Sequence, residues 1–110
     1  MSETLIDYQR TVAELLRLVE RIEAMAAVVR DAAEGFGKWP KLVVENSEAT
    51  FSTDLRTNPR YPKIDAKTWP TAEGMASLLA EYHEKKSAVE TLWDGMDEAE
   101  RVALRPPTDF

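Results

Sequence analysis

The chain of 110 residues contains no cysteine and only one histidine. Without cysteine there can be no disulfide framework, thiol nucleophile or cysteine-ligated metal site, and a single histidine removes most imidazole sites. The four glycines form neither a GxGxxG motif nor a phosphate-binding loop. No stretch approaches the roughly 18 consecutive apolar residues that a membrane span needs. These absences predict a protein without cofactor, metal or membrane partner.

The remaining composition is that of a folded acidic domain. Hydrophobic residues make up 44% of the chain, and the formal net charge is -6. The length fits a single domain covering residues 1–110. The first residues lack the apolar core of a secretory signal, so we expect a cytoplasmic protein. The acidity also disfavours general coating of nucleic acids, which relies on neutralising phosphates with lysine and arginine.

Apolar spacing predicts two long helices and one short helix. Over about residues 4–35 the spacing alternates between three and four, which is typical of a long helix with a packed face. The positions are Leu5, Tyr8, Val12, Leu15, Val19, Ile22, Ala26, Val29, Ala33 and Phe36. A second helix is predicted over about 71–94, with Met75, Leu79, Tyr82, Lys86, Val89 and Trp93 on its apolar face. A capping box at Asp97 and Glu100 predicts a third helix over about 97–104, with Val102 and Leu104 turned inward and frayed residues after it.

The predicted fold is therefore mainly α, an antiparallel, coiled-coil-like hairpin of two long helices. Leu16, Leu18 and Met25 widen the apolar stripe of the first helix beyond what one neighbour would cover. We therefore expect the chain to form a helical bundle with a second copy, a dimer being favoured. The predicted oligomer seam consists of Leu15, Leu18, Val19, Ile22, Met25 and Val29.

The connector over about 37–69 is rich in prolines and cannot be one helix. Leu42–Val44 and 49–53 have the composition of strands, so the connector is either irregular or a small β-hairpin. From Phe36 to Pro70 it holds six basic groups against four acidic ones, interleaved with aromatic residues. Such a segment is typical of a recognition surface. The predicted partner-binding residues are Arg56, Arg60, Tyr61 and Lys63, while Trp39 and Trp69 are either lids over the helices or contact residues.

No arrangement of residues indicates catalysis. His83 follows a residue of the apolar face and is expected at the surface, and no GxSxG motif accompanies it. We therefore expect a non-enzymatic helical interaction protein, such as a small adaptor, chaperone-like protein or regulatory subunit. It would self-associate through its long helix and present its connector to a partner. The alternatives are a nucleic-acid-associated accessory protein that uses the basic aromatic connector, and a non-catalytic subunit of a larger enzyme.

Overall fold

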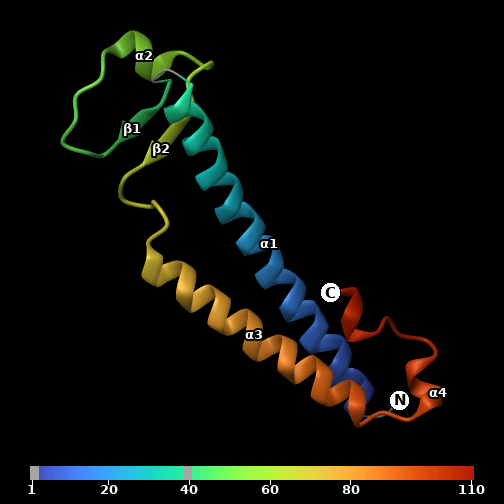
Figure 1. Cartoon of the computed structure of the whole chain (residues 1–110). Helices are drawn as coiled ribbons and strands as arrows, with labels where there is room; N and C mark the ends of the chain where they lie inside the picture. Colours follow the sequence, from blue (N-terminus) through green and yellow to red (C-terminus); the bar gives the residue numbers. More distant parts are fainter. Residues whose placement is uncertain (1–2, 39–40) are drawn as a thin grey trace. The chain divides into compact units, whose positions relative to one another are not determined.

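A computed structural model of the chain describes residues 3–38 and 41–110, and it is mainly helical (Figure 1). The chain divides into two compact units. The helical unit comprises Met1–Ile22 and Glu73–Phe110, and the connector unit comprises Glu23–Ala72. The elements in chain order are α1 (Glu3–Gly37), β1 (Val43–Glu45), α2 (Thr53–Thr57), β2 (Lys63–Asp65), α3 (Ala72–Asp94), α4 (Glu98–Arg101) and a 3-10 helix (Pro107–Asp109).

The two long helices predicted from the apolar spacing are confirmed. Helix α1 runs through Glu3–Gly37 and α3 through Ala72–Asp94, close to the predicted ranges. Glu3 and Glu73 place acidic side chains in the first turns, where the positive end of the helix dipole favours them. No helix in the described residues is long and apolar enough to cross a membrane.

The core of the helical unit lies between residues that are far apart in the chain. Tyr8 and Leu15 of α1 pack with Val89 of α3 and with Met96, which follows α3. The Tyr8 and Trp93 rings meet at a tilt of 42°, with centroids 5.6 Å apart. Further apolar side chains pack around this cluster, namely Leu5, Val12, Tyr82, Leu92, Trp93, Leu104 and Phe110. Burial of the apolar faces thus holds α1 and α3 together in this unit.

The C-terminal residues differ in part from the prediction. The Asp97 side chain accepts the Glu100 N–H, which confirms Asp97 as the N-cap of α4. Leu104 packs on the core as expected, but Val102 is 86% exposed, so its inward placement was wrong. The residues after α4, expected to be frayed, include a 3-10 helix over Pro107–Asp109. Pro107 is buried and Phe110 packs against the core.

The connector unit contains a two-stranded parallel sheet, and the alternative of a β-hairpin within 42–53 was wrong. Strand β1 pairs with β2 in the register Val43 to Lys63, Val44 to Ile64 and Glu45 to Asp65. Parallel strands require a crossover, and here the crossover contains α2. Ser52 caps that helix by accepting the Leu55 N–H, so the segment 49–53, expected to be the second strand, leads into a helix instead.

Asp65 ties the two strands together at the end of the sheet. The backbone after β1 turns at Asn46, whose φ of 58° is in the left-handed region that asparagine tolerates. The Asn46 side-chain amide donates to the Asp65 carboxylate at 2.9 Å, and the Lys67 N–H donates to the same carboxylate at 2.9 Å. These hydrogen bonds, led by that of Asn46, hold the pKa of Asp65 below its ordinary value. The charged form of Asp65 therefore stabilises the turns that follow both strands.

Candidate functional site

A groove lies in the connector unit beside the last turns of α1. Gly35 is buried there, and a Cβ at its position would stand 2.5 Å from Pro62 Cγ and 3.2 Å from the Lys41 carbonyl oxygen. The absence of a side chain thus allows the segments before β1 and β2 to pack directly on the helix. The groove has a volume of about 290 Å³, and it is lined by Asp31, Glu34, Gly35, Lys38, Lys41, Arg60 and Pro62.

The charges of this groove are partly compensated. The Lys38 ammonium donates to the Glu34 carboxylate at 2.7 Å. This hydrogen bond and the attraction of the charges lower the pKa of Glu34 and raise the pKa of Lys38. Lys41 and Arg60 have no ion-pair partner within residues 3–38 and 41–110. These two cations are the ones that an incoming acidic group could meet in the groove.

The structure does not gather the predicted partner-binding residues at one place. Arg60 lines the groove described above, whereas Arg56, on α2, lines a second hollow of about 370 Å³ beside β1. Tyr61 is half-buried. The Lys63 ammonium turns back onto its own loop, donating to the carbonyl oxygens of Asn58 at 3.0 Å and Tyr61 at 3.3 Å. Arg60 is thus joined by Lys38 and Lys41, which were not among the predicted residues. Trp69 is half-buried, and Trp39 lies outside the described residues.

The predicted seam residues divide into two groups. Leu15 and Leu18 are buried in the helical unit. The other four, Val19, Ile22, Met25 and Val29, are half-buried. On α3 the first two residues of the apolar face are exposed, Met75 to 39% and Leu79 to 47%. The apolar faces are thus well covered near Tyr8 and Val89 and less covered at the beginning of α3.

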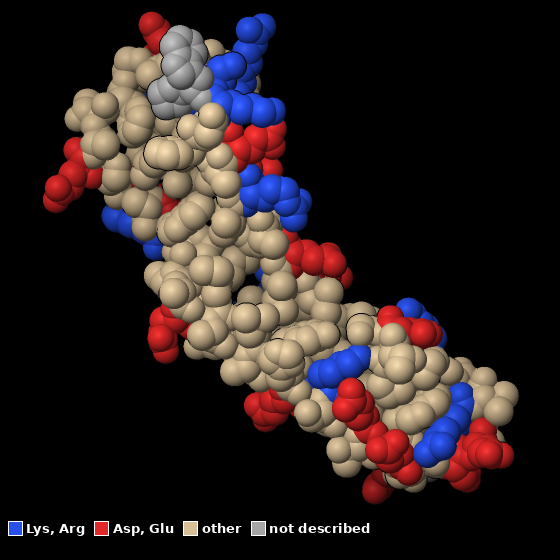
Figure 2. All heavy atoms as spheres, viewed as in Figure 1, with Lys and Arg blue, Asp and Glu red and all other residues tan. Residues whose placement is uncertain are grey.

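Charged side chains cross between α1 and α3 within the helical unit. The Lys85 ammonium donates to the Glu14 carboxylate at 2.6 Å, and Arg21 lies 3.7 Å from the Glu81 carboxylate. The hydrogen bond from Lys85 and its charge lower the pKa of Glu14, and the same contacts raise the pKa of Lys85. These residues border a charged hollow of about 410 Å³, which Arg17, Leu18 and Glu84 also line. Figure 2 shows acidic and basic side chains interspersed on the face in view.

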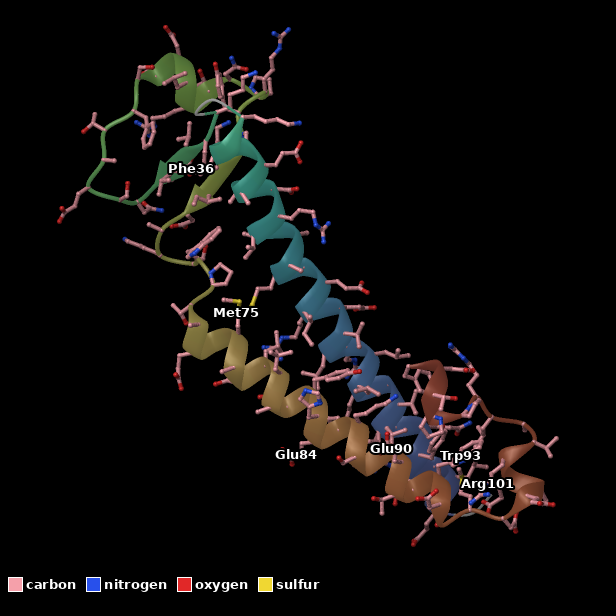
Figure 3. All side chains as sticks on the ribbon, viewed as in Figure 1. Phe36, Met75, Glu84, Glu90, Trp93 and Arg101 are labelled. Atoms are coloured by element: carbon pink, nitrogen blue, oxygen red, sulfur yellow. The ribbon has the colours of Figure 1, made fainter. Side chains whose placement is uncertain are left out.

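A second group of polar contacts surrounds the C-terminal residues, and most of it could not be predicted from the sequence. Tyr8 donates its O–H to the Arg105 carbonyl oxygen. Lys86 donates to the main-chain oxygens of Pro107 and Phe110, so its ammonium leaves the apolar face as a snorkelling lysine does but ends on protein oxygens. Arg101 lies 5.5 Å from the ring centre of Trp93 and donates to the Trp93 carbonyl oxygen (Figure 3). A lysine on an apolar face was the one signal in the sequence for this group.

The described residues offer no arrangement for a metal ion. They contain no group of three or more His, Asp and Glu side chains that could hold one. His83 is exposed, as expected, and its ring stands edge-on to Tyr82 with the centroids 5.3 Å apart. The features of the described residues that could bind a partner are the groove with its cations Lys41 and Arg60 and the exposed apolar side chains of α3.

No protein-family model, curated protein or solved structure matches the chain.

Proposed function

We propose that this chain is a non-enzymatic, cytoplasmic helical interaction protein that self-associates through its long helices and presents its connector to a partner. In this proposal the paired parts of α1 and α3 form an antiparallel helical hairpin. Three contacts support that arrangement, because they advance along α1 while they retreat along α3. They join Tyr8 to Trp93, Glu14 to Lys85 and Arg21 to Glu81.

The observation that carries the proposal is the exposure of Met75 and Leu79. Both occupy the same apolar face of α3 as Tyr82 and Val89, but they are 39% and 47% exposed, whereas Val89 is fully buried. Two apolar side chains one helical turn apart form a continuous uncovered strip. Burying such a strip against another apolar surface removes it from water at a gain of about 25 cal/mol per Å².

A second copy of the chain is the proposed occupant of this strip. Half-buried seam residues on α1, including Ile22 and Met25, provide further apolar surface that a copy could cover. Two hairpins would then form a four-helix bundle, the arrangement in which hairpins commonly bury such faces. A twofold dimer is the simplest assembly, because each copy presents the same patch to the other.

Sedimentation equilibrium tests self-association, with one substitution on the exposed strip and one beside it. Wild-type chain is expected at twice its mass of 12.4 kDa, and Leu79→Glu at the monomer mass, since the new charge would have to be desolvated in the interface. Ala80→Glu is the control, because Ala80 is the exposed neighbour of Leu79 and lies off the apolar face. Circular dichroism reports whether each variant remains helical. A monomeric wild type, or a dimeric Leu79→Glu, would reject the proposal.

The partner-binding part of the proposal rests on Arg56, Arg60, Tyr61 and Lys63, of which Arg60 is supported best. It shares its groove with Lys41, and neither cation has an ion-pair partner in the described part of the chain. We propose an acidic segment of a partner protein as the ligand, since two cations and Pro62 offer charge and an apolar contact together. The double substitution Lys41→Ala, Arg60→Ala is expected to abolish capture of such a partner. Lys67→Ala is the control, because Lys67 is an exposed lysine of the connector that does not line the groove.

The second candidate is a nucleic-acid-associated accessory protein, which the three cations around this groove favour. The formal net charge of -6 weighs against it, because nucleic-acid binding relies on neutralising many phosphates with lysine and arginine, whereas a short acidic segment needs few cations. Salt distinguishes the two candidates. Binding to a single-stranded oligonucleotide would fall steeply with salt concentration, and the slope would decrease in the Lys41→Ala, Arg60→Ala variant. An affinity for oligonucleotides that this double substitution leaves unchanged would remove the groove as a nucleic-acid site.

A further inference from the structure

The last six residues of the chain lie against α1 and α3 and are held chiefly by side chains that bind their backbone. Tyr8 of α1 donates to the Arg105 carbonyl oxygen. Lys86 of α3 donates to the main-chain oxygens of Pro107 and Phe110, at 2.9 Å for the latter. Main-chain oxygens of three of the segment's six residues are therefore bound by donors from the two long helices.

Two apolar side chains complete the attachment. Pro107 is buried, and Phe110 packs against the core cluster of Tyr8, Leu15, Val89 and Met96. The intervening residues Thr108 and Asp109 are exposed. Peptide-binding grooves recognise short segments in the same way. Hydrogen bonds to the peptide backbone give affinity, and apolar side chains that anchor the peptide give specificity.

The segment also holds its own conformation. The Arg105 guanidinium lies 4.9 Å from the ring centre of Phe110 and 3.7 Å from the Asp109 carboxylate. Asp109 and Phe110 donate their N–H groups to the carbonyl oxygens of Pro106 and Pro107. The two prolines restrict the backbone further. These contacts within the segment reduce the conformational entropy that it loses when it binds.

We infer that Tyr8, Lys86 and the adjoining core face form a peptide-binding groove whose ligand is the segment 105–110, and that two copies of the chain exchange this segment. The contacts above depend on the segment and not on which chain supplies it. Residues 102–104 join α4 to the segment; Val102 and Ala103 are exposed, and Leu104 packs against the core. Exchange of an identical element is a low-cost route to a dimer. The exchange rests on the proposed self-association, which brings the two copies together and raises the local concentration of the segment.

Peptide binding tests the groove. The probe is a fluorescent peptide with the sequence of residues 105–110, titrated into a full-length chain carrying Pro107→Ala and Phe110→Ala, which weaken its own segment. Fluorescence anisotropy is expected to show that the peptide binds this variant. Its affinity for the wild-type chain is expected to be at least tenfold lower, because the wild-type chain's own segment competes for the groove. Adding Lys86→Met is expected to weaken binding by at least tenfold, since a hydrogen bond from a charged group is lost. A peptide with alanine at the proline and phenylalanine positions is the control ligand.

Tyr8→Phe provides a second groove variant if Lys86→Met loses helix by circular dichroism, because it removes one donor and keeps the ring in the core. The same titration with Leu79→Glu added is expected to give unchanged affinity. Because Leu79→Glu disrupts only the proposed self-association, this titration tests the groove independently of the dimer. Absence of peptide binding by the helical Pro107→Ala, Phe110→Ala chain would overturn the groove.

Complementation tests the exchange. A chain with Lys86→Met has an intact segment and a defective groove, and the Pro107→Ala, Phe110→Ala chain has the reverse. A mixture of differently tagged forms of these two restores one intact site only if the segment passes between chains. We expect the two chains of this mixture to co-purify at concentrations at least tenfold lower than those at which a control mixture still co-purifies. The control mixture contains two differently tagged Pro107→Ala, Phe110→Ala chains. Equal stability of the two mixtures would overturn the exchange.

Discussion

Glu14 of α1 and Lys85 of α3 stand 71 positions apart in the chain, yet their carboxylate and ammonium groups are 2.6 Å apart. Both side chains are partly exposed, so the surrounding water and salt weaken their attraction. The pair lies one helical turn from Leu18 on α1, which is buried in the core. The pair therefore indicates the register of the two helices and contributes little to their stability.

This ion pair predicts a pH dependence of stability. The pKa of Glu14 is lower in the folded chain than its ordinary value of 4.5, so the pair's contribution is present above about 4.5 and is lost as the pH falls through the lower folded pKa. The pKa of Lys85 is raised above 10.5, so the contribution is also lost as the pH rises through that raised value. Glu14→Gln is therefore expected to lower the melting temperature slightly at about pH 7 and not at about pH 2. A difference that persists in strong acid, or that ignores added salt, would contradict this explanation.

Two adjacent leucines on α1 are expected to respond differently to truncation. Leu15 is fully buried and Leu16 is 39% exposed. Leu15→Ala leaves a cavity in the core and is expected to lower the free energy of unfolding by about 2–5 kcal/mol. Leu16→Ala is expected to change it by less than about 1 kcal/mol, because half-exposed apolar atoms gain less from folding. Urea denaturation followed by circular dichroism measures both. Equal losses would mean that the helix packs on a different face.

Gly35 and Gly37 form a second matched pair. At Gly35 a new Cβ would clash with Pro62 Cγ at 2.5 Å, whereas at Gly37 it would meet nothing within 4 Å. Gly35→Ala is expected to destabilise the connector unit by about 1–3 kcal/mol through overpacking. Gly37→Ala is expected to be neutral or stabilising by up to about 1 kcal/mol, because alanine favours the helix. Hydrogen exchange of the β1 and β2 amides localises the effect. Protection that is the same in both variants would show that the α1 end does not pack on these segments.

Tyr8 links the core to the C-terminal segment through its hydroxyl group. Tyr8→Phe keeps the ring but leaves the Arg105 carbonyl oxygen without this donor, and it is expected to lower the free energy of unfolding by about 0.5–1.5 kcal/mol. Burial, followed by the Asp109 charge, raises the pKa of Tyr8 above 10.0. Its hydroxyl therefore contributes stability that is present below 10.0 and is lost as the pH rises through the folded pKa. Urea titrations at neutral and alkaline pH measure this, and a difference from Tyr8→Phe that does not shrink in alkali would contradict the assignment.

The helices could be predicted because their signals are local. The apolar spacing of α1 and α3 and the cap at Asp97 each involve residues within a few turns of one another. The connector could not be predicted in the same way. The Ser52 cap with Asp54 in the first turn and Arg56 in the last was a local signal for α2 that the strand-like composition of 49–53 concealed. The partner of β1 lies beyond a crossover of 17 residues, 46–62, and no local pattern marks it.

The candidate sites show the same division. The apolar spacing placed Lys86 on the apolar face of its helix, but only the packed structure shows that its ammonium reaches main-chain oxygens of Pro107 and Phe110. Basic residues in the connector predicted a charged surface, but the fold separates Arg56 from Arg60 and brings Lys41 beside the latter.

The sequence by itself determined the two long amphipathic helices, the break between them and the acidic balance, because helix formation depends on side chains three and four residues apart. Tertiary structure alone decided which strands pair, where the C-terminal segment lies and which seam residues are buried or only half-buried. Those outcomes depend on contacts between residues tens of positions apart, and their free energies become favourable only once the intervening chain has folded.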